Sequence, residues 1–243
     1  MVIKRPQFVN DEIYHVVLRA IDENLIFKDT DDYYRGIFSI YEFNTTKPVS
    51  IKEQRKIRTR IKKAARGLTS GNSVVFEKDE REKMVEILSF CFMPNHIHLL
   101  LKQLKNNGVT DFMRKVGTGY AGYFNRKYNR KGHVFQNRFL AVLIKDDNQL
   151  KIVFTYVHAN PISLIEPNWK EVGIKESEKT IGFLENYKWS SYQDYIGKKN
   201  FPSVTERKFL SEIMDKEQGC KNFIENWIEY KKEIKDFGDA QLE

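Results

Sequence analysis

The chain has 243 residues, which suits one domain with additions or at most two small domains. Charged residues make up 30% of it, and 41 Lys and Arg against 33 Asp and Glu give a formal net charge of +8, which favours a polyanionic partner. Cys91 and Cys220 form no CxxC pair, and the chain shows neither a signal-peptide pattern nor a run of about 18 apolar residues. We therefore expect a cytoplasmic protein without a disulfide framework or a membrane span.

The first third of the chain predicts a strand, a helix and a basic insertion. Residues 12–20, EIYHVVLRA, are rich in β-branched and aromatic residues and predict a strand. Aspartates then precede apolar residues at helical spacing between 33 and 41, which predicts a helix. Residues 44–80 are strongly basic and end in a Gly/Ser/Asn cluster, which predicts an inserted arm. A solvated linker and a direct contact role are both open for this arm.

The middle of the chain predicts a hairpin and a long helix. Residues 83–93 predict a second strand, and Pro94-Asn95 marks a turn before a third strand, so the two strands should pair as an antiparallel hairpin. Residues 110–130 predict a helix with an inward aromatic stripe. Its three glycines, Gly117, Gly119 and Gly122, carry a cost in a helix and indicate close packing or a break.

A fourth strand and a further helix follow. Residues 133–144 predict the strand, and the segment DDNQLKIVFTYVHANP predicts a helix that an aspartate caps and Pro161 stops. This order predicts an α+β fold: a ferredoxin-like central antiparallel sheet with helices packed on one face and one helix added. We expect one domain over 1–200, with the insertion at about 44–80, and a helical extension over 201–243. The extension has Phe209, Ile213, Phe223 and Trp227 as candidate apolar anchors.

The segment CFMPNHIHLLLK, residues 91–102, places two histidines one residue apart. On a strand, side chains alternate, so His96 and His98 should share one face while Ile97 and the leucines point into a core on the other. Two neighbouring imidazoles supply half of a metal site, although two surface histidines on a half-buried strand would give the same pattern.

Tyr156 and Asn160 lie four residues apart on the last predicted helix, so they share a helix face. An asparagine carbonyl is a hard oxygen ligand that could complete a two-histidine site for Mg²⁺ or Mn²⁺. A tyrosine beside such an ion could act as a nucleophile toward phosphorus. An Asn before Pro is, however, often only a helix stop, and the chain has 12 tyrosines.

Five segments taken together resemble the REP-associated tyrosine transposases, within the single-tyrosine HUH transposases. They are YHVVLRAIDENLIFKDTDD, FCFMPNHIHLLLK, GYFNRKYNRKGHVFQNRF, YVHANP and WSSYQDYIG, in the family's order. The resemblance implies that His96 and His98 hold a divalent metal, Mg²⁺ or Mn²⁺, and that Tyr156 is the nucleophile. Asn160 falls where the wider class often places a polar third ligand. The implied product on single-stranded or hairpin DNA is a 5′-phosphotyrosine link with a free 3′-OH.

Other residues suit DNA contacts. Aromatic and basic side chains interleave on the predicted helix at 110–130, a pattern typical of stacking and backbone contacts. Gln136 and Arg138 would alternate onto one strand face, and Arg138 is the candidate phosphate contact near the metal. The candidate set is Arg114, Lys115, Tyr123, Arg126, Lys127, Arg130, Lys131, Gln136 and Arg138. His15, His133 and His158 are interpreted as lying outside the site.

Three functions fit these patterns. The first is a DNA-nicking and joining transposase that acts through Tyr156. The second is a metal-dependent nuclease that activates water, and the third is a domesticated nucleic-acid-binding protein without turnover. A covalent protein–DNA adduct separates the first from the second. Whether the chain acts as a monomer or as a homodimer is left open, as is the DNA target.

Overall fold

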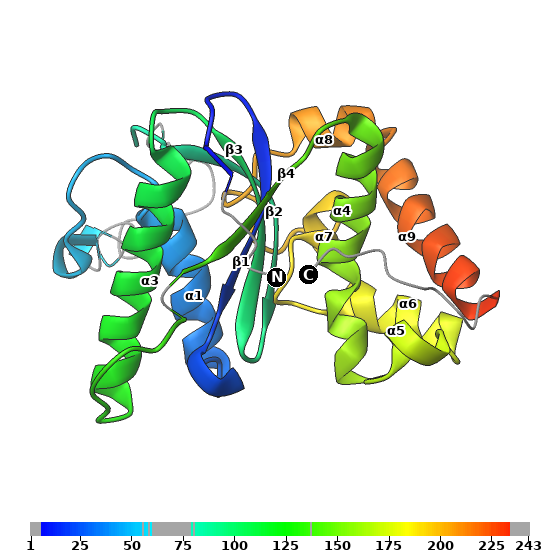
Figure 1. Cartoon of the computed structure of the whole chain (residues 1–243), viewed down its shortest axis with the longest axis horizontal. Coiled ribbons are helices and arrows are strands. Elements are labelled where there is room, and N and C mark those ends of the chain that lie inside the picture. Colours follow the sequence, from blue (N-terminus) through cyan, green and yellow to red (C-terminus); the bar gives the residue numbers. More distant parts are fainter. Residues whose placement is uncertain are drawn as a thin grey trace, which may run out of the picture.

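A four-stranded antiparallel sheet forms the central layer of the protein (Figure 1). The computed structural model describes residues 6–54, 56, 57, 59, 79, 81–136 and 138–233. Strands lie in the order β2-β3-β1-β4, which is the ferredoxin-like arrangement predicted from the sequence. The elements of this unit are β1 (Ile13–Arg19), α1 (Thr30–Glu42), β2 (Val85–Met93), β3 (His96–Gln103), α3 (Gly108–Lys127), β4 (Leu140–Leu143) and α4 (Asp147–Ala159).

Helices cover both faces of the sheet. On one face α1 and α3 close a core that contains Ile97, Leu99 and Leu101 of β3. On the other face a second core joins Cys91 and Leu100 of the sheet to α4 and the C-terminal helices. The α+β fold class is thus confirmed, while the expectation that helices pack on one face holds only for α1 and α3. The remaining elements are η1 (Ile21–Glu23), η2 (Asn160–Leu164), α5 (Trp169–Val172), α6 (Ser177–Asn186), α7 (Tyr192–Tyr195), α8 (Lys208–Ile213) and α9 (Lys216–Glu233).

The fourth strand is shorter than predicted. Only Leu140–Leu143 forms a ladder, with β1, whereas Phe135 makes one isolated bridge to Ala20. Val134 and Phe135 are consecutive in the chain and both buried in the first core. Two successive inward side chains are incompatible with the alternation of a regular strand, so the predicted strand over 133–144 is wrong for residues 133–139.

In its described part the C-terminal extension contains the helices α8 and α9, and half of its predicted anchors are wrong. Phe209 and Phe223 are exposed, because the buried side chains are Leu210 and Ile224, one position further along each helix. Ile213 and Trp227 do pack against the second core. The boundary at residue 200 stays a prediction.

For two further expectations, the structure bears only on the described residues. Most of the basic segment predicted at 44–80 lies outside the described residues, so its role stays a prediction. Among the helices that are described, none is both long and apolar enough to span a membrane.

The three glycines of α3 have different surroundings. A Cβ added at Gly119 would overlap the ring of Phe43, whereas one at Gly122 would meet only Arg126 Nη1 at 4.0 Å. Phe43 is buried and its ring has little room to move. We expect Gly119→Ala to destabilise the fold by about 1–3 kcal/mol. Gly122→Ala should stabilise it by up to about 1 kcal/mol. Urea unfolding of both variants tests this, and equal effects would contradict it.

Candidate active site

The histidines of β3 lie on the sheet face that α4 covers. His98 pairs in register with Val17 on β1 and with Cys91 on β2, so it occupies the middle of the sheet. Its side chain is buried, whereas His96, opposite Arg19 at the end of the strand, is partly exposed. The expected alternation is therefore confirmed, with one difference: the histidine face lies beneath a helix.

His98 hydrogen-bonds to a third histidine that the sequence interpretation placed outside the site. Nδ1 of His98 lies 3.0 Å from Nε2 of His15, and the two rings stack with centroids 5.2 Å apart. Nε2 of His98 has no hydrogen-bond partner among the described residues. Burial, followed by the charge of Arg19, lowers the pKa of His15 to about 4. Burial also lowers the pKa of His98, so both imidazoles are neutral at pH 7.

His96 has its own orienting neighbour in the turn before the strand. Nδ1 of His96 lies 2.6 Å from the side-chain oxygen of Asn95. An amide oxygen only accepts, so Nδ1 of His96 donates, and in the neutral imidazole Nε2 then carries the lone pair. The rings of His96 and His98 are 4.8 Å apart at their centroids, which places the two imidazoles side by side.

Tyr156 lies above these rings on α4. Asp146 caps this helix by accepting a hydrogen bond from the Gln149 backbone N–H at 2.8 Å. The Tyr156 ring stands edge-on to His98, with centroids 5.6 Å apart, and to His15 at 5.8 Å. The predicted nucleophile and the predicted ligand His98 are therefore neighbours, although they are far apart in the sequence.

Asn160 and Lys170 complete the surroundings of Tyr156. Asn160 ends α4, is buried, and donates a side-chain N–H to the Tyr156 backbone carbonyl at 2.7 Å. This hydrogen bond leaves the Asn160 side-chain oxygen as its acceptor group. Lys170 on α5 places Nζ 5.4 Å from the centroid of the Tyr156 ring. The sequence analysis did not name Lys170, because no sequence motif marks the turn that brings α5 beside Tyr156.

Comparison with known families gives the site a context. Residues 52–160 match the family model described as "Transposase IS200 like", just under half of the chain. This stretch of the chain is therefore similar to the IS200-like transposases. The matched window includes His96, His98, Tyr156 and Asn160 but neither His15 nor Lys170.

The individual relatives of the chain are distant. A Haemophilus influenzae protein named as a REP-associated tyrosine transposase is 30% identical over 87 residues, which are 32% of this chain and 49% of that protein. The chain thus spans about half the length of that curated relative. A REP-associated tyrosine transposase solved with a REP hairpin is 13% identical, with a TM-score of 0.48, and the match covers 86% of this chain and 96% of that one. A Deinococcus radiodurans transposase is 14% identical, with a TM-score of 0.32 and coverage of 62% and 92%.

Of the candidate DNA contacts, Gln136 lies near the histidine end of the sheet. The Gln136 backbone N–H donates to the Arg19 carbonyl at 2.9 Å, so Gln136 lies where β1 ends beside His96. Arg138 is exposed. Because residues 133–139 are not a strand, the predicted alternation of these two side chains on one strand face is wrong.

The remaining candidates lie on or just after α3, on the opposite side of the sheet from the histidines. Several are engaged within the protein. Lys127 and Tyr123 contact the buried Asp32, and Lys115 Nζ contacts main-chain carbonyls, among them Lys47 O at 3.0 Å. Arg114 pairs with Asp111 at 3.1 Å. Arg126, Arg130 and Lys131 are exposed. A role in DNA binding stays a prediction for all of them.

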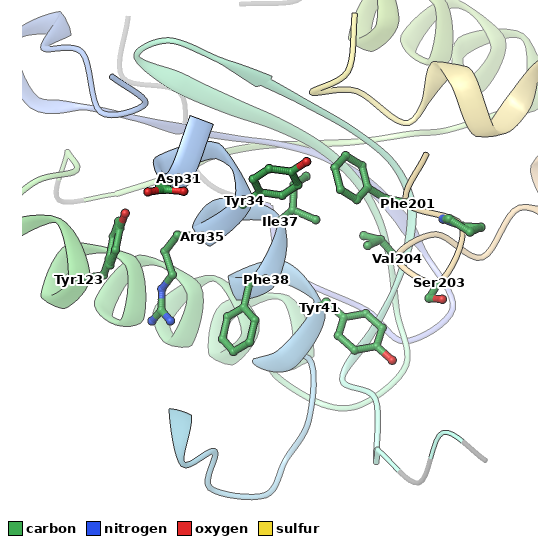
Figure 2. Close-up of a pocket in the computed structure, with 11 residues that line it drawn as sticks. Asp31, Tyr34, Arg35, Ile37, Phe38, Tyr41, Tyr123, Phe201, Ser203 and Val204 are labelled. Carbon is green, nitrogen blue, oxygen red and sulfur yellow. The ribbon is translucent and has the colours of Figure 1, made fainter. Parts of the chain in front are cut away.

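A hollow of about 710 Å³ also opens on the α1 side of the protein. Figure 2 shows the rings of Tyr34, Phe38, Tyr41 and Phe201 around it, with Tyr123 at one end. None of the histidines and no atom of Tyr156 line this hollow. It is therefore separate from the candidate active site.

His158 faces away from Tyr156, as predicted, and gives a test of pH dependence. It is buried, with Nε2 2.8 Å from Ser191 Oγ, and burial lowers its pKa to about 3. The unfolded state, with a pKa near 6.5, binds more protons below that pH, so stability falls as the pH falls from about 6.5 toward 3. Between pH 7 and pH 5 the loss from this residue is about 2 kcal/mol.

We expect His158→Gln to have a shallower dependence of stability on pH than the wild type over that range. The free energy of unfolding in urea, measured at pH 7 and at pH 5 for both proteins, gives the two slopes. Identical slopes would contradict a neutral buried His158.

Proposed function

We propose that the chain cleaves and rejoins single-stranded or hairpin DNA through Tyr156, with a divalent metal held by His96 and His98. The observation that carries this proposal is the position of Tyr156, edge-on above His98 and His15 on the covered face of the sheet. The match of residues 52–160 to the IS200-like family model supports DNA strand transfer as the reaction class. The net charge of +8 suits a polyanionic substrate.

The residues present fit a hard divalent ion. Nε2 of His98 is a buried nitrogen without a partner among the described residues, and it is one of the two nitrogens through which a neutral imidazole can bind metal. His96 lies beside it, and Asn160 would offer an amide oxygen. No cluster of three or more His, Cys, Asp or Glu that could hold a metal occurs in the described part of the chain. Two imidazoles and one amide oxygen would leave positions open for phosphate oxygens, as Mg²⁺ and Mn²⁺ sites commonly do.

In the proposed reaction the Tyr156 hydroxyl loses its proton to water and its oxygen attacks the scissile phosphorus. The bond between phosphorus and the 3′ oxygen breaks, and that oxygen takes a proton to become a free 3′-OH. The product is a 5′-phosphotyrosine, and the reverse attack by a 3′-OH rejoins the strand. A bound divalent ion would polarise the phosphate. Lys170 Nζ lies 5.4 Å from the centroid of the Tyr156 ring, within the range of a cation–π contact.

A labelled-strand assay tests this proposal. Hairpin oligonucleotides carrying a label at the 5′ or the 3′ end are incubated with the wild-type protein and Mn²⁺, then run on denaturing protein gels. We expect a slow protein–DNA band from the 3′-labelled strand only, and its loss when a chelator is added. Cleavage without any adduct would indicate water as the nucleophile and overturn the proposal. Binding without cleavage on a panel of hairpins would favour the non-catalytic alternative.

A further inference from the structure

His15 lies close to the candidate metal site without being placed to bind the metal itself. It stands on β1 two residues before Val17, the in-register partner of His98, so its side chain is diagonal to His98 on the same sheet face. It is 2% exposed, and its Nε2 points at Nδ1 of His98 from 3.0 Å. Nε2 of His15 is therefore engaged in the hydrogen bond between the His15 and His98 rings.

Only one direction of this hydrogen bond leaves His98 Nε2 with a lone pair that can bind a metal. If His15 Nε2 donated, His98 would carry its proton on Nε2, and that N–H would be a buried donor without a partner among the described residues. If His98 Nδ1 donates to His15 Nε2, the unpartnered atom is a lone pair, which is what a metal ligand needs. The two rings are also nearly parallel, with an interplanar angle of 8°.

We propose that His15 is a positioning residue that holds His98 as the Nδ1–H tautomer and so directs its Nε2 toward the divalent ion. This inference rests on the metal site of the proposed function. The second ligand gives independent support, because Asn95, in the turn directly before His96, favours the same tautomer on His96. Both ligands would then present Nε2.

A neutral imidazole suits this role at a DNA-cleaving site. Ligand histidines commonly donate to a carboxylate, a backbone carbonyl or water. A carboxylate here would add a negative charge where a phosphodiester must enter. An imidazole such as His15, with Nε2 3.0 Å from His98 Nδ1, can accept the hydrogen bond without adding that charge.

Two variants separate the accepting nitrogen from the ring that carries it. His15→Phe keeps the stacking ring but removes the acceptor. His15→Gln places an amide oxygen close to the position of Nε2 and so can accept from His98 Nδ1. His133→Phe removes an exposed histidine and is the matched control. Thermal unfolding of each variant establishes that it is folded.

The readout is Mn²⁺ affinity of the full chain without DNA, by calorimetry or by electron paramagnetic resonance. We expect His15→Phe to weaken Mn²⁺ binding about 10- to 100-fold. His15→Gln should stay within several-fold of the wild type, and His133→Phe should match it. Equal affinity in wild type and His15→Phe would overturn the inference.

A second measurement does not depend on metal or cleavage. ¹⁵N NMR of the metal-free wild type should show His98 protonated at Nδ1, and an Nε2–H signal would overturn the inference. If the wild type binds Mn²⁺ and His98→Ala does not, while His15→Phe binds normally, only the positioning role fails. If His98→Ala binds Mn²⁺ as well as the wild type, the proposed metal site itself is wrong.

Discussion

Tyr156→Phe is expected to abolish the covalent protein–DNA adduct and to lower strand cleavage by roughly 10⁴-fold or more, the scale on which loss of a catalytic nucleophile acts. The change removes one oxygen and keeps the ring that packs beside His15 and His98. It should therefore leave folding and Mn²⁺ affinity close to those of the wild type.

The measurement is the single-turnover rate of adduct formation on a 3′-labelled hairpin at saturating Mn²⁺. Tyr230→Phe is the matched control, because Tyr230 is an exposed tyrosine on α9. It should form the adduct at the wild-type rate. Thermal unfolding checks that both variants are folded.

This prediction separates the transposase from the water-activating nuclease. A nuclease that uses the same histidines would keep cleaving after Tyr156→Phe and would form no adduct in either protein. An adduct that persists in Tyr156→Phe would point to another tyrosine as the nucleophile. Either result would remove Tyr156 from the mechanism.

The sequence is sufficient to predict that His96 and His98 share one face of the sheet. It is insufficient to predict the contact between His98 and His15. Alternation in HIHLLL places His96 and His98 together and Ile97 in the core because a strand has period two, whatever its neighbours are. His15 has the same alternation on β1, but its contact with His98 depends on the register of β1 against β3. A single sequence does not carry that register, so the sequence pattern alone leaves His15 outside the site.

Errors elsewhere also come from tertiary packing. The sequence pattern places Val134 and Phe135 in a strand, yet both side chains are buried in the first core. In the C-terminal extension, the exposed Phe209 and Phe223 show that the predicted buried face of each helix is displaced by one residue. Lys127 and Tyr123 read as DNA contacts because they are basic and aromatic. Their partner, Asp32, is about 90 positions earlier in the chain, and charge patterning does not reveal it.

Asp32 is the centre of a network that joins the start of α1 to the end of α3. Its carboxylate is fully buried and accepts hydrogen bonds from the Lys28 backbone, Tyr123 and Tyr128, the last at 2.6 Å. It also pairs with Lys127 Nζ at 2.7 Å. Desolvation lowers the pKa of Lys127, but its hydrogen bonds to Asp29 and Asp32 outweigh this and raise it above the ordinary value.

Asp32→Ala is therefore expected to destabilise the fold by about 3–5 kcal/mol, because it removes a buried acceptor and leaves two hydroxyls and an ammonium without it. Asp29→Ala is the matched control. Asp29 also pairs with Lys127 and caps α1, but its side chain is half exposed, so its loss should cost about 1 kcal/mol. Urea unfolding at pH 7 gives both values. Equal losses in the two variants would contradict a buried network centred on Asp32.

The same network decides what Lys127 does. If Lys127 serves chiefly to neutralise Asp32, then Lys127→Met should lower the free energy of unfolding and leave DNA affinity per folded molecule unchanged. Arg126, its exposed neighbour, should show the reverse if α3 contacts DNA: little change in stability, and weaker binding with a reduced dependence on salt. If the Lys127→Met variant has wild-type stability but binds hairpin DNA more weakly, Lys127 contacts DNA, as its charge first indicated, and the structural role is wrong.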